Sequence, residues 1–191
     1  MRLIKRKMNR LGQIWVETVI YTLIGLVLLG ILLAFAVPEI QKQKDKAVIG
    51  NTINAMNELD NNIVDVRRNG PGNVREMSFL INRGSLIIDS GGDKLSFIID
   101  DSEFVYSEVG RDVLLSGTNL KVLTEENGKK YRVSLILDYR SGTRTNITFD
   151  GNDNEKSLTP ASISYNLIIE NFGRGDINDE NSFVNVDISE E

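Results

Sequence analysis

A basic stretch at the start of the chain is followed by a long apolar one. Residues 1–12 carry five basic residues and no acid, whereas residues 14–37 give 24 positions whose only formal charge is Glu17. About 20 apolar residues are enough to cross a hydrocarbon core about 30 Å thick as a helix. Because basic segments are retained on the cytoplasmic side of a membrane, this order predicts that residues 38–191 lie on the opposite side.

A helical pattern resumes directly after Pro38. Apolar residues recur at steps of three and four and so share one face of a helix; they are Ile49, Ile53, Met56, Leu59, Ile63 and Val66. The polar residues between them are expected to form a solvated face; they include Lys42, Lys44, Asp45, Asn54, Asn57, Glu58 and Asp65. The sequence Asn69-Gly70-Pro71-Gly72 is a strong stop signal. If Pro38 only kinks the helix, residues 13–68 form one element, about 84 Å long.

Beyond residue 73 the apolar period changes to two, which is typical of strands with one buried face. Candidate strands are 77–81, 85–89, 95–100, 104–109, 113–116, 118–124, 131–140, 143–149, 162–171 and 184–188. The pattern predicts an α+β protein, in which a long N-terminal helix packs on a C-terminal antiparallel β-sandwich-like domain. The expected parts are a basic leader (1–12), an apolar helix (13–37), its amphipathic continuation (38–69) and a β-rich domain (70–191).

Composition narrows the function classes. The whole chain carries a formal charge of −5 and residues 1–12 alone carry +5, so residues 13–191 carry −10. The acidic body makes nucleic-acid binding unexpected. The chain has no cysteine and no histidine, which excludes disulfides, thiolate metal sites, His-containing triads and histidine zinc sites. We therefore expect neither an enzyme nor a bound cofactor or metal.

Three interpretations compete for residues 1–37. A cleaved secretory signal is supported by the basic start and by Ala34-Phe35-Ala36, which resembles an A-x-A cleavage site. Against it, the apolar run is longer than the usual 7–15 residues. A permanent membrane anchor would fit the run, but neither it nor a signal peptide needs Glu17. An acid near the start of an apolar helix costs a few kcal/mol unless it is paired.

The third interpretation explains Glu17. The segment Arg10-Leu11-Gly12-Gln13-Ile14-Trp15-Val16-Glu17 resembles the cleavage region of type IV prepilins, and more closely that of archaeal pilins and archaellins, which carry a class III signal peptide. This resemblance covers about 60 of the 191 residues. It implies that a prepilin peptidase cuts after Gly12, that Gln13 becomes the mature N-terminus and that Glu17 is the fifth mature residue.

The resemblance also implies a function and partners. The protein would be a major or minor structural subunit of an extracellular filament, made in the membrane and serving adhesion or motility. Its partners would be the prepilin peptidase, a cytoplasmic assembly ATPase, a membrane platform protein and further copies of itself. Glu17 of an incoming subunit would meet the Gln13 amine of its neighbour and fix the axial register. The alternative function is a membrane-anchored or secreted β-domain that acts as a monomeric binding or adhesion module.

Two motifs in the predicted β-rich domain each have a functional interpretation and a simpler structural one. Asn146-Ile147-Thr148 is an N-glycosylation sequon in the domain placed outside, so a glycan at Asn146 is as plausible as a bare strand. Residues 150–155 alternate oxygen-bearing side chains as the start of a calcium loop does. They lack the glycine at position six and the acid at position twelve, which favours an ordinary turn.

Overall fold

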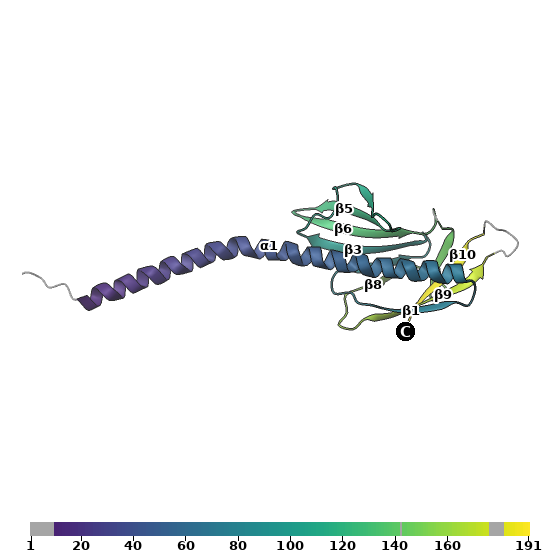
Figure 1. Ribbon diagram of the computed structural model, residues 1–191, viewed down its shortest axis with the longest axis horizontal. Coiled ribbons are helices and arrows are strands. Elements are labelled where there is room, and N and C mark those ends of the chain that lie inside the picture. The colour runs from purple at the N-terminus through teal and green to yellow at the C-terminus, as the bar shows by residue number, and fades with distance from the viewer. Residues whose placement is uncertain (1–9, 142, 176–181) are drawn as a thin grey trace, which may run out of the picture. The chain divides into compact units, whose positions relative to one another are not determined.

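The computed structural model describes residues 10–141, 143–175 and 182–191, with side chains described from Trp15 onward. The chain divides into two compact units, Met1–Gln41 and Lys42–Glu191. Over the described residues, one helix (α1) is followed by ten strands, β1 to β10 (Figure 1). The chain is therefore an α+β protein with a C-terminal β domain, as the sequence pattern predicted.

Helix α1 spans Arg10–Asn69 and includes Pro38. The prediction of one long helix over residues 13–68 is confirmed, with the helix beginning three residues earlier. It ends at the predicted stop signal, where Gly70 has a φ of +87°. This backbone conformation suits glycine and ends an α-helix, because other L residues rarely adopt it. The part of α1 from Lys42 onward belongs to the second unit.

The strands of the second unit form two sheets. The first has the order β1-β9-β10-β7, with β1 (Val74–Phe79), β9 (Tyr165–Arg174), β10 (Val184–Glu190) and β7 (Thr145–Phe149). The second has the order β4-β5-β6-β3-β2-β8, with β4 (Asp112–Leu114), β5 (Lys121–Asn127), β6 (Lys130–Asp138), β3 (Lys94–Ser102), β2 (Ser85–Asp89) and β8 (Lys156–Leu158). Pairing is antiparallel except between β7 and β10, which run parallel from Thr145 opposite Val184 to Phe149 opposite Ile188. Between them the chain forms β8 and β9, and this longer connection allows it to return in the same direction.

One hydrophobic core joins α1 to both sheets of the second unit. The predicted apolar stripe is confirmed, since all six of its residues are buried and the most exposed, Ile53, reaches only 9%. They pack with residues such as Phe79 and Ile169 of the first sheet and Phe97 and Leu135 of the second. Figure 1 shows this half of α1 running along the strands. Each buried aliphatic side chain contributes roughly 1.5–3 kcal/mol, so the stripe fixes the helix to the domain.

Residues 104–109 do not form the predicted strand. Two of their backbone N–H groups bond to side chains instead of to a neighbouring strand. The N–H of Phe104 donates to Ser102 Oγ at 3.1 Å, and that of Ser107 donates to Thr124 Oγ1 at 3.2 Å. The apolar residues here thus belong to a loop held by hydroxyl groups.

Several strand boundaries also differ from the predictions. The strand expected over 118–124 begins at Lys121, because the Thr118 hydroxyl accepts a hydrogen bond from the Leu120 N–H at 3.2 Å and holds a turn. The strand expected over 162–171 lies three residues later as β9. Strand β8 has only three residues, too few for alternation to be recognised, and was not predicted.

Candidate membrane-spanning and assembly segment

The apolar first half of α1 has the local chemistry of a membrane segment. Among the described residues, α1 is the one helix long and apolar enough to cross a membrane, judged by length and composition. Leucine, isoleucine and valine fill most positions between Trp15 and Val37. The hydroxyl of Thr22 donates to the carbonyl oxygens of Thr18 at 3.0 Å and Val19 at 2.9 Å. This polar group is thereby satisfied inside the helix and can enter an apolar medium.

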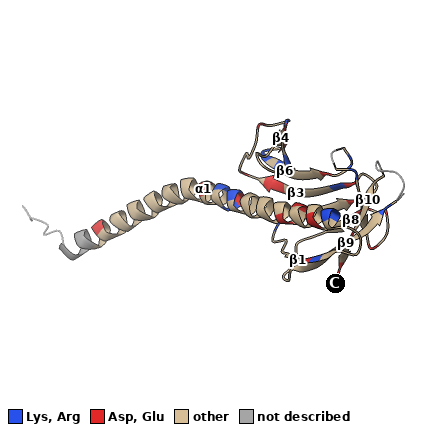
Figure 2. Ribbon diagram, turned by 45° about the vertical axis from the view of Figure 1, so that its right-hand side comes forward, with Lys and Arg blue, Asp and Glu red and all other residues tan. Residues whose placement is uncertain are grey.

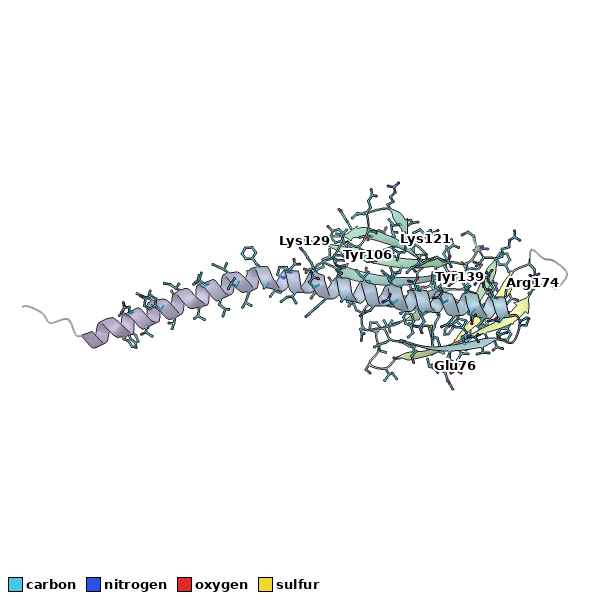
Figure 3. The ribbon with its side chains drawn as sticks, viewed as in Figure 1. Glu76, Tyr106, Lys121, Lys129, Tyr139 and Arg174 are labelled. Atoms are coloured by element: carbon cyan, nitrogen blue, oxygen red, sulfur yellow. The ribbon has the colours of Figure 1, made fainter. Side chains whose placement is uncertain are left out.

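The apolar side chains of this segment have no protein cover. Every large hydrophobic residue between Trp15 and Val37 exposes between 44% and 76% of its surface. Figure 3 shows these side chains standing out along the helix. A continuous apolar surface of this size is unstable in water and requires lipid or other helices around it. The segment is therefore consistent with membrane anchoring.

Gly12, Gln13 and Glu17 lie in the first turns of α1. The backbone of Gly12 and Gln13 is helical, and Glu17 is exposed one turn further on. Positions four apart lie on the same face of a helix, so a carboxylate at position 17 lies near the residue-13 end of α1. The described helix begins at Arg10, and its first turn carries no acidic residue.

Gly25 and Gly30 have open surroundings within their own chain. A Cβ atom added to either would meet nothing within 4 Å. Gly30 and Ala34 are four residues apart and form a small, shallow area on one face of the helix. Small residues at this spacing allow close approach of a second helix in a membrane, although glycine is also simply tolerated in such helices.

One polar anchor at the start of the second unit was missed in the sequence. Asp45, predicted to lie on a solvated face, is only 1% exposed. Its carboxylate pairs with the guanidinium of Arg83 and accepts a hydrogen bond from the Glu103 N–H at 2.7 Å. Nη2 of Arg83 donates to the carbonyl oxygens of Asp100 and Asp101, each at 2.7 Å. A signal was present, because Asp45 stands four residues before Ile49, on the line of the buried stripe.

A second polar anchor lies midway along the packed half of α1. The buried carboxylate of Asp60 accepts hydrogen bonds from the Tyr139 hydroxyl at 2.9 Å and from Asn119 Nδ2 at 2.8 Å. Burial raises the pKa of Tyr139 well above its ordinary value of 10.0, and the charge and hydrogen bond of Asp60 act in the same direction. Figure 3 labels Tyr139 beside the helix.

A third anchor holds the C-terminal end of α1. Asn171, on β9 and 1% exposed, donates from Nδ2 to the carbonyl oxygen of Val66 at 2.8 Å. Its Oδ1 accepts a hydrogen bond from the Gly173 N–H at 2.7 Å. Because the last carbonyl groups of a helix have no partner within it, this contact satisfies one of them. The second half of α1 is therefore held by polar bonds near its start, middle and end as well as by the core.

The glycosylation sequon lies on β7, at an edge of the first sheet. Asn146 Nδ2 donates to Asn185 Oδ1 at 3.1 Å, and the Thr148 hydroxyl donates to Asp187 Oδ1. Both side chains that a glycosylating enzyme would need are thus bonded to β10 in the folded domain.

Residues 150–155 form a turn after β7. Asp150 and Gly151 both have positive φ angles, and the N–H of Gly151 donates to Asp187 Oδ1 at 2.8 Å. Over the part of the chain that the structure describes, no three His, Cys, Asp or Glu side chains are grouped to hold a metal ion. The oxygen-rich sequence serves to close a turn.

The sequence matches no protein-family model and no curated protein, and the fold matches no solved structure.

Proposed function

We propose that this protein is a structural subunit of an extracellular type IV pilus-like filament, cleaved after Gly12 and assembled through its N-terminal helix. One observation carries the proposal. A single helix combines an uncovered apolar half, one carboxylate four residues after Gln13, and a second half fixed to its own β domain. A plain membrane anchor needs only the first of these features.

The two halves of α1 suit a subunit that exchanges lipid for protein. Before assembly the apolar half lies in the membrane, and after assembly the same side chains pack against neighbouring helices in the filament core. Lipid tails are as apolar as a neighbouring helix, so burial alone does not drive extraction. An assembly ATPase acting through a membrane platform protein would supply that work.

Glu17 would define the assembled state. Cleavage after Gly12 creates a free α-amine on Gln13, a cation at a helix start where the dipole disfavours positive charge. An isolated carboxylate within an apolar core is costly unless it is paired. Pairing Glu17 of one subunit with the Gln13 amine of the next satisfies both groups and fixes the step between subunits. The β domain would then form the outer surface, with a role in adhesion or motility.

The mature N-terminus tests the proposal. Intact-mass and peptide mass spectrometry of the protein from its own cells should find Gln13 as the first residue, and the protein should be found in sheared surface filaments. A chain that keeps Met1 or begins at Val37, and that stays monomeric, would contradict the proposal. It would support the anchored or secreted monomeric module instead.

A further inference from the structure

Three lysines lie on α1 at the start of the second unit. Lys42, Lys44 and Lys46 are all exposed, and they follow Val37, the last residue of the apolar run, by five to nine residues. At a helical rise of 1.5 Å per residue, this is roughly 8–14 Å along the helix. The polar headgroup region adds about 5–8 Å on each side of the hydrocarbon core, and lysine side chains can reach back towards it. Figure 2 shows basic residues, in blue, grouped along one stretch of α1.

Several acids close to these lysines already have cations of their own. Asp45 is buried and paired with Arg83. The carboxylate of Glu103 lies 3.7 Å from Lys130 Nζ, and that of Asp100 lies 2.6 Å from Arg132 Nε. Glu39 precedes the lysines on α1, and Asp101 follows Asp100 in the second unit. Three of these acids are thus paired with other cations, while Lys42, Lys44 and Lys46 are exposed.

A shallow groove adjoins the lysines on the same helix. It is lined by residues including Lys46, Ala47, Gly50 and Tyr106 and is widely open to solvent. The small side chains at positions 47 and 50 make the hollow, since a Cβ at Gly50 would meet nothing within 4 Å. The Nζ of Lys46 lies 5.8 Å from the ring centroid of Phe104, which packs edge-on against Tyr106.

Tyrosine next to exposed lysine is typical of protein surfaces at a membrane–water interface. Tyrosine is enriched at the headgroup level because its ring is apolar and its hydroxyl is polar. Figure 3 places Tyr106 at the end of the unit opposite to Arg174. The groove thus has one lysine, Lys46, and one aromatic side chain, Tyr106, among its lining residues, and both are groups that can contact a phosphate-bearing headgroup.

We propose that the lysine belt of α1, in which Lys42 and Lys46 lie on one side of the helix and Lys44 on the other, binds anionic phospholipid headgroups at the outer membrane surface before the subunit is assembled. The inference rests on the membrane-inserted state of the proposed function and not on cleavage or polymerisation. Attraction between lysine and an anionic surface is worth about fivefold in binding per residue and weakens with salt. The lysine belt therefore holds this stretch of α1 at the membrane surface until the subunit is extracted.

A lipid-retention experiment tests this proposal with the full chain. The protein is inserted into vesicles of equal parts phosphatidylglycerol and phosphatidylcholine, extracted in a mild neutral detergent, and the retained lipids are counted by mass spectrometry. The test variant is Lys42→Gln/Lys44→Gln/Lys46→Gln. The control variant, Lys94→Gln/Arg140→Gln/Arg174→Gln, removes the same charge elsewhere on the unit. Since the basic residues 1–12 also attract anionic lipid, the two triple variants are compared with each other.

We expect the control variant to retain phosphatidylglycerol as the wild type does and the test variant to retain at least about fivefold less. Equal retention by both variants would overturn the proposal. Sodium phosphate should displace the lipid no better than sodium chloride of equal ionic strength. Stronger displacement by phosphate would indicate a free-phosphate site and also overturn it. Flotation of each variant with the vesicles checks insertion separately, so a failure of the proposed membrane state is distinguished from a failure of the lysine belt.

Discussion

The Tyr139 hydroxyl donates a hydrogen bond of 2.9 Å to the carboxylate of Asp60, and both residues are buried. The bond joins the residue that follows β6 to the middle of the packed half of α1, 79 residues away in the chain. Tyr139→Phe would keep the ring in the core but remove one donor from a buried charge. We expect a loss of about 1.5–3 kcal/mol in the free energy of unfolding, measured by urea denaturation of the full chain in neutral detergent.

The matched control is Tyr165→Phe, because the Tyr165 hydroxyl makes an exposed bond to the Thr159 carbonyl at 2.7 Å. It should cost less than about 1 kcal/mol. The pH dependence adds a second test. The raised pKa of Tyr139 means that its stabilisation is complete below pH 10.0 and is lost as the pH rises towards its folded value. The advantage of wild type over Tyr139→Phe should therefore shrink above pH 10, and a constant difference would contradict this assignment.

Arg83 is predicted to matter more for stability than a more exposed arginine. Arg83→Met would leave the buried Asp45 carboxylate without its cation and should cost about 3 kcal/mol or more. The control is Arg75→Met, since Arg75 pairs with Asp65 at 2.6 Å but both side chains are over one-third exposed. That variant should lose less than about 1 kcal/mol. Similar urea midpoints for the two variants would show that the Asp45 pair is not an anchor.

The apolar stripe of α1 could be predicted from the sequence, whereas the Asp45–Arg83 pair could not. The stripe follows a period of 3.6 residues, which is a local property of the chain. The pair joins residues 38 positions apart, and their contact depends on how the strands pair. The position of Asp45 four residues before Ile49 was the only local sign that it would be buried.

In the sheets and in the candidate site, too, local patterns could be predicted from the sequence, whereas contacts between distant residues could not. Alternation located most strands, but the parallel pairing of β7 with β10 depends on where β8 and β9 lie. The features at Gly12, Gln13 and Glu17 were recognisable because they depend on linear register. The structure adds that this register falls within one helix whose apolar side chains are uncovered.

Gly84 shapes the turn that carries Arg83 to the helix. It has a φ of +88°, and a Cβ atom there would lie 2.4 Å from the carbonyl oxygen of Ile98. Gly84→Ala should therefore be strongly destabilising, through both the backbone conformation and the backbone clash. Gly128→Ala is the control, since Gly128 has a φ of +68° but open surroundings and should show the conformational cost of about 1–2 kcal/mol alone. Thermal unfolding followed by circular dichroism should rank Gly84→Ala well below Gly128→Ala, and equal melting temperatures would contradict the clash.

Asp93 is expected to reduce stability at neutral pH. Burial raises its pKa, Asp153 and Asp89 add to the rise, and the bond from the Ile147 N–H together with the charge of Arg140 opposes it. A raised folded pKa means that the contribution to stability is present below about pH 3.8 and is lost as the pH rises through the folded value. Asp93→Asn keeps an oxygen for the Ile147 N–H, so it should raise the urea midpoint at pH 7 and have no effect below pH 3.8.

Asp138 is a control for Asp93, because its pKa is lowered instead of raised. Partial burial acts to raise its pKa, but hydrogen bonds from Ser141 and Arg140 outweigh burial and lower it. Its contribution to stability is present above about pH 3.8 and is lost as the pH falls through the folded value. Asp138→Asn should therefore lower the urea midpoint at pH 7, with the difference disappearing in acid. Shifts of the same sign for the two variants would contradict both assignments.

Glu17 and Gly12 are predicted to act at separate steps of biogenesis. Gly12→Phe should block the peptidase and leave the leader attached, because a bulky ring replaces the residue before the cut. Glu17→Ala should be cleaved normally, since the carboxylate is not at the cut, but incorporation into filaments should fall at least about tenfold as the Gln13 amine loses its partner. Thr18→Ala, next to Glu17 on the same helix but uncharged, is the control and should assemble. The measurements are the mass of the mature N-terminus and the amount of subunit in sheared filaments. Normal processing of Gly12→Phe would place the cleavage site elsewhere, and normal assembly of Glu17→Ala would refute the pairing between neighbouring subunits.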